Sequence, residues 1–234
     1  MCNGLVKFPR TPHLLWPLAR PPKDDRVLSL ADAENFLSGN ITVEEKVDGA
    51  NIGFSLDDFG SVRVQNRGSW LAKGAHPQFQ PLWGWIAEKT SALMGLLKPS
   101  RILFGEWCFA VHSVPYDRLP DWFLAFDVFD CDENRFWSSS RRDELLRGTG
   151  IHHVPRMLAR SASLSAVQRL LQSAQSNIGA HPVEGLYLRR EGVEWLESRA
   201  KLVRPEFLLD MDEHWSERPL VRNKLAAEAP LLRF

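Results

Sequence analysis

The sequence predicts an α+β fold in which antiparallel sheets dominate. Short runs alternate apolar and polar residues, as strands with one buried face do, and Asp-Gly or Glu-Gly pairs separate several of these runs. Few stretches have helical spacing. Strands that are joined by tight turns pair antiparallel, whereas a doubly wound parallel sheet needs a helix between successive strands.

The strand pattern begins at Ile41. Strands are expected over residues 41–46, 52–56 and 61–67, with turns at Asp48-Gly49 and at residues 57–60. This order predicts an antiparallel meander with Lys46 at its first corner. Residues 1–40 precede it as an N-terminal arm, and we expect the segments 8–14 and 16–25, which contain closely spaced prolines, to run extended over the surface.

The remaining elements follow from periodicity and from helix start and stop signals. Helices are expected over residues 81–97, 138–148 and 163–175, and strands over residues 101–107, 122–130, 183–190 and 194–203. No low-complexity linker or internal repeat interrupts this order. We therefore expect one domain over residues 1–210 and a short C-terminal tail over residues 211–234.

Composition excludes several classes of protein. The chain is 44% hydrophobic and 25% charged, as globular domains are. It has neither an apolar run that could span a membrane nor a signal peptide, so we expect a cytoplasmic protein with no membrane partner. Cys2, Cys108 and Cys131 fit neither a disulfide framework nor a zinc pair, and we expect Cys108 and Cys131 to fill apolar space inside strands. The scattered histidines show no zinc signature.

Lys46 is the candidate nucleophile, although its local motif is weak by itself. A lysine before an Asp-Gly turn is ordinarily a solvated hairpin residue. However, polar residues on later strands have the types that a lysine needs to attack a nucleoside triphosphate. The attacking amine must be deprotonated, so a pKa of about 10.4 must fall by roughly three units. Lys201, Arg67 and a metal ion on the triphosphate are candidates for lowering it.

Six blocks of sequence resemble the covalent nucleotidyltransferase superfamily, which comprises ATP- and NAD-dependent DNA ligases, RNA ligases and mRNA-capping guanylyltransferases. In the order of that superfamily they are EKVDGAN (45–51), QNRG (65–68), LFGEW (103–107), FLAFDVFD (123–130), VEGLYLR (183–189) and RAKLVRPEF (199–207). FPRTPHL (8–14) and AVHSVPYDRLPDWF (110–123) are similar to the branch of RNA ligases that resembles RNA ligase 2. The resemblance implies the antiparallel-sheet nucleotidyltransferase fold of ATP-dependent ligases.

The resemblance also implies a role for each matching residue. Lys46 would become lysyl-AMP, Lys201 would bind the α-phosphate, and Glu184 would hold a catalytic Mg²⁺ or Mn²⁺ through water. The other contacts to ATP would come from Glu45 beside the base, Asn51 beside the phosphates, Arg67 at the ribose or 5′-phosphate, Glu106 at the ribose hydroxyls and Phe126 stacked on adenine. Considered alone, Arg67 could instead be a hairpin ion-pair partner and Asp127 a polar residue at a strand edge.

The chain departs from the superfamily pattern in two places. Many relatives have a second lysine two positions after Lys201, where this chain has Val203. Arg199 on the same face of the strand, or Arg204 on the opposite face, would then supply the missing phosphate contact. Only 27 residues follow Phe207, which is too few for the oligonucleotide-binding barrel of DNA ligases and capping enzymes.

The activity implied is that of an ATP-dependent RNA ligase. It would join a 3′-hydroxyl to a 5′-phosphate through lysyl-AMP and an adenylylated strand, in RNA repair, with RNA ends or nicked duplex as partners and an end-healing kinase or phosphatase beside it. A DNA or mixed RNA/DNA nick ligase and a non-catalytic nucleotide- or end-binding module are the alternatives, although pure binding has no need of Lys46. The net charge is zero, but residues 135–234 carry 16 Lys and Arg against 12 Asp and Glu, so a local basic face is compatible with it. The sequence does not specify an oligomeric state.

Overall fold

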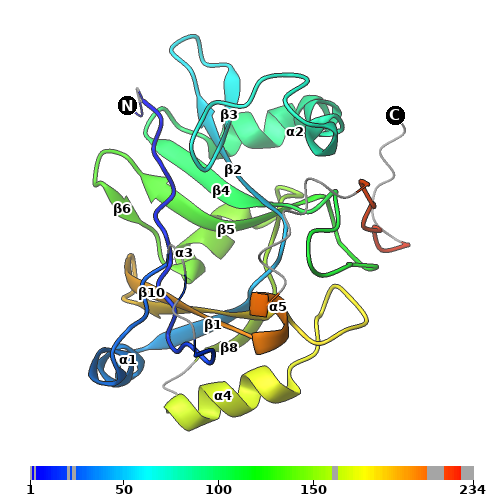
Figure 1. Cartoon of the computed structure of the whole chain (residues 1–234). Helices are drawn as coiled ribbons and strands as arrows, with labels where there is room; N and C mark the ends of the chain where they lie inside the picture. Colours follow the sequence, from blue (N-terminus) through cyan, green and yellow to red (C-terminus); the bar gives the residue numbers. More distant parts are fainter. Residues whose placement is uncertain are drawn as a thin grey trace.

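The computed structural model describes residues 2, 4–19, 22, 25–159, 163–209 and 219–227. Within these residues two sheets form the body of the protein, with sheet B drawn above sheet A in Figure 1. Sheet A has the strand order β10-β9-β1-β8, and sheet B has the order β3-β2-β4-β5-β6 with β7 paired to β5. Because all pairs except β5–β7 are antiparallel, the predicted fold class is confirmed.

Sheet A packs its outer face against two helices. Its strands are β1 (Ile41–Glu45), β8 (Arg156–Ala159), β9 (Gly185–Glu191) and β10 (Leu196–Val203), and the helices are α1 (Leu30–Leu37) and α4 (Leu164–Ser173). Ile41 and Val43 of β1, Phe36 of α1 and Leu171 of α4 belong to one apolar core. The hairpin of β9 and β10 is confirmed, and α1 follows the segments of the N-terminal arm that were predicted to be extended. The side chain of Ser29 caps α1 by accepting the amide of Asp32 at 3.1 Å.

Sheet B packs its outer face against one long helix. Its strands are β2 (Ala50–Leu56), β3 (Val62–Asn66), β4 (Arg101–Trp107), β5 (Phe123–Asp130), β6 (Arg135–Phe136) and β7 (His152–His153), and the helix is α2 (Leu82–Leu96). Trp85 of α2 is fully buried and stacks on Phe54 of β2 at 5.5 Å. Shorter helices are η1 (Pro77–Phe79), α3 (Ser139–Leu146) and α5 (Pro205–Leu209). Helices α2, α3 and α4 confirm the three predicted helices.

The predicted hairpin between the first two strands is wrong. All five residues of β1 are buried, and β1 already pairs with β8 on one side and β9 on the other, so no free edge is left for β2. Strand β2 pairs with β3 and β4 in the other sheet. Residues 46–49 therefore carry the chain from sheet A to sheet B. A Cβ at Gly49 would lie 2.7 Å from the carbonyl oxygen of Trp107, so only glycine fits this crossing.

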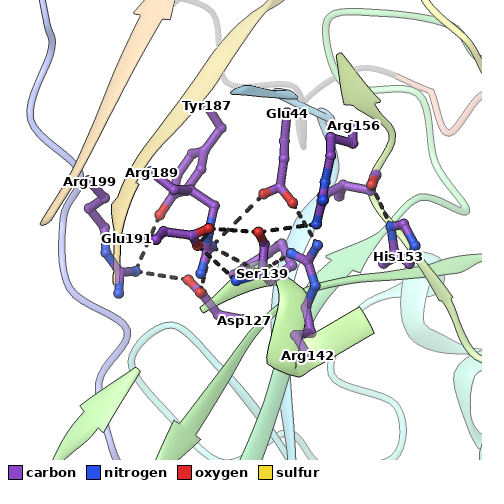
Figure 2. A network of polar contacts seen from close by, with 12 residues as sticks. Glu44, Asp127, Ser139, Arg142, His153, Arg156, Tyr187, Arg189, Glu191 and Arg199 are labelled. Atoms are coloured by element: carbon purple, nitrogen blue, oxygen red, sulfur yellow. Dashed lines mark hydrogen bonds and ion pairs between the residues drawn. The ribbon is translucent and has the colours of Figure 1, made fainter. Parts of the chain in front are cut away.

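A buried network of charged side chains joins the inner faces of the two sheets (Figure 2). Arg189 of β9 donates to Asp127 of β5 at 2.7 Å and to Glu191. Arg142 of α3 donates to Glu44 of β1 at 2.6 Å. The side chains of Arg142, Arg189, Glu44 and Asp127 are all fully buried. Asp127 is thus an interior ion-pair partner and not a polar residue at a strand edge.

The N-terminal arm packs against the inner face of sheet B. Phe8 is buried and makes edge-to-face contacts with Phe104 at 5.0 Å and Phe126 at 5.2 Å. At the start of the arm, Cys2 forms a disulfide with Cys131, which follows β5. This disulfide corrects the prediction that the cysteines stay unpaired, while Cys108 is free and buried. Sequence spacing could not reveal the pair, because the bonded residues are 129 positions apart. No helix in the described ranges is long and apolar enough to cross a membrane.

We expect Arg189→Met to lower the free energy of unfolding by about 3–5 kcal/mol, because buried Glu191 would lose its cation and buried Asp127 would keep only Arg199. Urea unfolding followed by tryptophan fluorescence measures this change. Arg190→Met is the matched control, since Arg190 is partly exposed and pairs with the exposed Glu197; we expect a loss of about 1 kcal/mol or less there. Equal losses in the two variants would contradict the structural role of the network.

Candidate active site

A cavity of about 270 Å³ is lined by residues of both sheets, of the crossing segment and of the N-terminal arm. Of the eight residues to which the resemblance assigned a role at ATP, all but one line it: they are Glu45, Lys46, Asn51, Arg67, Glu106, Phe126 and Lys201. The exception, Glu184, contacts Lys46 directly. Residues from six separate sequence blocks therefore meet at one place.

Lys46 lies where the chain leaves β1. Its backbone N–H donates to the carbonyl oxygen of Gly185, which fixes it beside β9. Its Nζ lies 2.7 and 2.6 Å from the two carboxylate oxygens of Glu184. Burial alone would lower the pKa of Lys46, but the charges of Glu184 and Asp48 outweigh burial and raise that pKa. The protein's own groups therefore do not produce the predicted depression of this pKa.

The crossing segment after Lys46 is held by the loop that follows β4. The backbone N–H of Asp48 donates to the hydroxyl oxygen of Tyr116 at 2.9 Å. The Asp48 carboxylate in turn accepts the backbone N–H groups of Ser113 at 2.6 Å and Val114 at 3.3 Å. Residues 113–116 thus fix the position of the chain just after the candidate nucleophile.

The C-terminal tail holds this loop in turn. Asn223 is buried, and its side-chain amide donates to the carbonyl oxygens of Cys108 at 2.8 Å and Ala110 at 3.2 Å. Its Oδ1 accepts the backbone N–H of Tyr116 at 2.6 Å. A continuous series of hydrogen bonds therefore runs from Asn223 through Tyr116 to Asp48, two residues after Lys46.

Two buried acceptors of the cavity lack a partner among the described residues. Asn51 of β2 and Glu106 of β4 lie opposite each other in the sheet, and the Oδ1 of the first and the Oε2 of the second have no hydrogen bond. Burial, together with the nearby charge of Asp48, raises the pKa of Glu106 to about 8, although Lys46 and Arg67 oppose the shift. Because unpaired buried acceptors are costly, this wall fits a ligand that brings hydroxyl or amine donors.

Phe126 and Glu45 line other parts of the cavity. The backbone carbonyl of Phe126 accepts from Arg142 at 2.6 Å and from Arg189 at 3.1 Å, so the buried ion network fixes the position of this aromatic residue. The Glu45 carboxylate accepts the hydroxyl of Ser176 at 2.5 Å and an adjacent backbone N–H at 3.1 Å. Burial raises the pKa of Glu45 despite these hydrogen bonds.

Lys201 is bound to a carboxylate that the sequence did not indicate. Its Nζ donates to Asp25 in the N-terminal arm, and His13 lies 3.7 Å from the same carboxylate. Burial, together with the charge of Lys46, lowers the pKa of Lys201, although Asp25 acts in the opposite direction. Burial also lowers the pKa of His13 to about 4, so this histidine is neutral at physiological pH.

The arginines that were predicted as substitutes for a second lysine lie outside the cavity. Arg199 donates to Asp127 at 3.0 Å and to the hydroxyl of Tyr187 at 3.2 Å, within the buried network. Arg204 donates to backbone carbonyls, including that of Leu171 in α4 at 2.5 Å. Both guanidinium groups thus have structural partners within the protein. Arg67, by contrast, is exposed at the cavity, and no described residue of the hairpin forms an ion pair with it.

The sequence did not reveal the residues of the N-terminal arm that line the cavity, nor the hydrogen bonds by which Asn223 of the tail holds the loop after β4. Phe8 and Thr11 line the cavity and belong to the FPRTPHL block, so that block was the available signal for them. Asp25 and Asn223 had no such signal, because their roles depend on contacts across 176 and 107 sequence positions, respectively.

Comparison with known proteins identifies the family. The RNA ligase family matches residues 39–203, which is most of the chain. No curated protein matches the chain by sequence.

Solved structures of an RNA ligase from Naegleria gruberi share the fold. A lysine-to-methionine mutant with AMP and Mn has a TM-score of 0.59 at 18% identity, over 77% of this chain and 54% of that one. An arginine-to-alanine mutant with ATP and Mn has a TM-score of 0.63 at 18% identity, over 89% and 59%. The enzyme with PPi has a TM-score of 0.60 at 20% identity, over 79% and 55%. The chain spans little more than half of the length of these structures. On the extent of the family match, the chain belongs to the RNA ligase family.

Proposed function

We propose that this protein is an ATP-dependent RNA ligase that joins a 3′-hydroxyl end to a 5′-phosphate end. The observation that carries the proposal is the position of Lys46, whose amine lies on a cavity between two sheets and is held by the carboxylate of Glu184. The Naegleria gruberi structures with ATP, PPi and AMP contain the substrate of lysine adenylylation, the pyrophosphate that this step releases and the nucleotide that the third step releases, and they support the same chemistry here.

The first step is attack of the neutral Lys46 amine on the α-phosphorus of ATP. An N–P bond forms, the bond from the α-phosphorus to the bridging oxygen breaks, and pyrophosphate leaves. In the second step a 5′-phosphate oxygen of the strand attacks the same phosphorus and releases the lysine. In the third step the 3′-hydroxyl attacks the activated 5′-phosphate, and AMP leaves.

The cavity residues fit the parts of ATP by their chemistry. Phe126 provides a face for the adenine, and Glu45 borders the base. Glu106 and Asn51 provide the unpaired acceptors for the ribose hydroxyls and for groups beside the phosphates. Lys201 binds the α-phosphate once this phosphate replaces Asp25 as its anionic partner.

A divalent metal ion fits the carboxylate of Glu184. The described part of the chain has no cluster of three or more potential metal-ligating side chains. Mg²⁺ commonly uses one or two protein carboxylates together with substrate phosphates and water. When bound, the ion would neutralise charge on the triphosphate, and Glu184 would then no longer hold the ammonium form of Lys46. This exchange of partners is how we reconcile the raised pKa of Lys46 with its role as a nucleophile.

Two alternatives use the same site differently. A DNA or mixed RNA/DNA nick ligase would carry out the same three steps, and a panel of nicked duplexes with RNA or DNA at each end separates it from an RNA ligase. A non-catalytic end-binding module would have no use for the buried Lys46–Glu184 pair. A role in RNA repair, in the cytoplasm and beside an end-healing kinase or phosphatase, remains part of the proposal.

The wild-type protein, incubated with α-labelled ATP and Mg²⁺ or Mn²⁺, should acquire a covalent label that acid releases and alkali does not. Lys46→Ala should acquire none, because it has no nucleophile. Gel electrophoresis and autoradiography measure the label. Absence of label on the wild-type protein with both metals would refute the covalent mechanism, and labelling by GTP alone would favour a capping enzyme.

Glu184→Gln should lower the pKa of Lys46 relative to wild type, because the lysine stays buried while its carboxylate partner becomes neutral. At a fixed pH below the pKa, the neutral fraction of the amine increases about tenfold for each unit by which the pKa falls. More of the Lys46 amine is then neutral at pH 7. Titration of ¹³C-methylated lysines by NMR, with Lys46→Arg for assignment, measures this without ATP. Glu197→Gln, which alters an exposed carboxylate, is the control. An unchanged pKa in Glu184→Gln would contradict our account of the pair.

Asn223→Ala should slow adenylylation of Lys46 and lower the free energy of unfolding by about 1–3 kcal/mol, because buried groups at Cys108, Ala110 and Tyr116 lose their partner. Exchange of the Tyr116 amide proton should become faster, while amides of β9 stay protected. Asn223→Asp keeps the acceptor for Tyr116 and should be intermediate. Arg222→Ala, at the exposed neighbouring position, is the control. Unchanged labelling and exchange in Asn223→Ala would show that the tail does not position the site.

A further inference from the structure

One stretch of the sequence carries positive charge without any acidic residue. Between Gly60 and Ala87 the chain has Arg63, Arg67 and Lys73 but no Asp or Glu. The whole protein has zero net charge, so this stretch is a local excess of positive charge. It includes β3, which is the edge strand of sheet B, and the loop that follows β3 (Figure 1).

The loop after β3 has a fixed conformation. The Oδ1 of Asn66 accepts the backbone N–H groups of Gly68 at 2.9 Å and Ser69 at 2.8 Å, and the backbone N–H of Asn66 donates to the carbonyl of Ser69. Leu71 then returns to the core and donates its N–H to Val64 of β3. Arg67 and Trp70 are therefore presented on a tight turn that is tied at both ends, and this turn loses little conformational freedom when it binds a ligand.

Trp70 is an exposed aromatic residue with a cation stacked on it. It remains 41% exposed, and the guanidinium carbon of Arg63 lies 4.3 Å from the centre of its ring. Arg63 is fixed by Ser55 at 2.9 Å and by the backbone carbonyl of Cys2. An exposed tryptophan has no structural need for such a support, but an aromatic platform beside fixed positive charge is what stacked bases and phosphates require.

The turn continues directly from the active-site cavity. Arg67 lines the cavity and is exposed, while Trp70 and Lys73 follow it on the surface. We propose that Arg67, Trp70 and Lys73 form a track along which a single-stranded polynucleotide end enters the site, with a base stacked on Trp70 and a phosphate at Lys73. This inference rests on the proposed ligase function and extends it, because it assigns a surface outside the nucleotide cavity to the strand. A protein partner is disfavoured, because Trp70 is the one large exposed hydrophobic side chain between residues 60 and 87 and the rest of the track is charged, whereas charged residues are depleted at the centre of protein interfaces.

The test uses the full chain and a short, fluorescent, 5′-phosphorylated single-stranded oligoribonucleotide. Anisotropy measures its Kd, and labelling with α-labelled ATP measures adenylylation of Lys46 separately. Trp70→Ala should raise the Kd roughly 5- to 100-fold, as loss of one stacked base does. Trp70→Phe should restore most of the affinity. Lys73→Ala should reduce the slope of log K against log salt by about 0.7, as expected for one phosphate contact on a single strand. Adenylylation should be unchanged in all three variants.

Phe59→Ala is the matched control. Phe59 is 94% exposed but lies between an acidic residue and glycine in the turn that precedes β3, whereas the Trp70 turn follows β3. If Trp70→Ala binds the oligoribonucleotide as wild type does, or loses no more than Phe59→Ala, the track is refuted. A surface that binds a protein and not the strand would give that result. If instead the wild type is not adenylylated, the ligase function fails, while the anisotropy measurement still tests the track.

Discussion

The charged network between the two sheets is the interaction on which the site depends. Each sheet already has an apolar core on its outer face, so the inner faces could have met through apolar side chains as well. They meet through Arg142 and Arg189, which are fully buried between Glu44 and Asp127. Buried ion pairs seldom add stability over apolar packing, but they require specific geometry. Both arginines also donate to the backbone carbonyl of Phe126, and the network thereby fixes the position of an aromatic residue that lines the cavity.

The same geometry explains why the candidate nucleophile lies at residue 46. The chain must leave sheet A, where β1 has a neighbour on each side, and reach sheet B within a few residues. The residue at this crossing belongs to neither ladder, so its side chain is available to the cavity. Its charge is then satisfied by Glu184, next to Gly185, whose carbonyl binds the Lys46 backbone. Two adjacent residues at the start of β9 therefore hold both parts of Lys46: Gly185 binds its main chain and Glu184, which precedes the strand, binds its ammonium group.

Much of this could be predicted from local pattern. Strands β4 and β5 and helices α2, α3 and α4 follow from alternation, periodicity and caps, and the residues that line the cavity follow from the resemblance in blocks. Strand pairing was harder to predict, because the Asp48-Gly49 pair fits either a hairpin turn or a crossing between two sheets. The structure distinguishes these possibilities, because β1 already pairs with β8 and β9. The state of Lys46 was not predictable either, since the lowering effect of burial and the raising effect of Glu184 oppose each other and only distances decide between them.

Segments remote from the predicted motifs complete the cavity. Asp25 of the N-terminal arm binds Lys201, and Asn223 of the tail binds the loop that holds Asp48. The two contacts differ in kind. Asn223 forms hydrogen bonds with buried, neutral backbone groups. These bonds can persist through a reaction cycle, because no charged group has to change its partner. Asp25 neutralises a cation that a phosphate would also neutralise, and the two anions cannot share it without repulsion. Under the proposed function, the contact between Asp25 and Lys201 is one that a bound phosphate would replace, whereas the hydrogen bonds of Asn223 would persist.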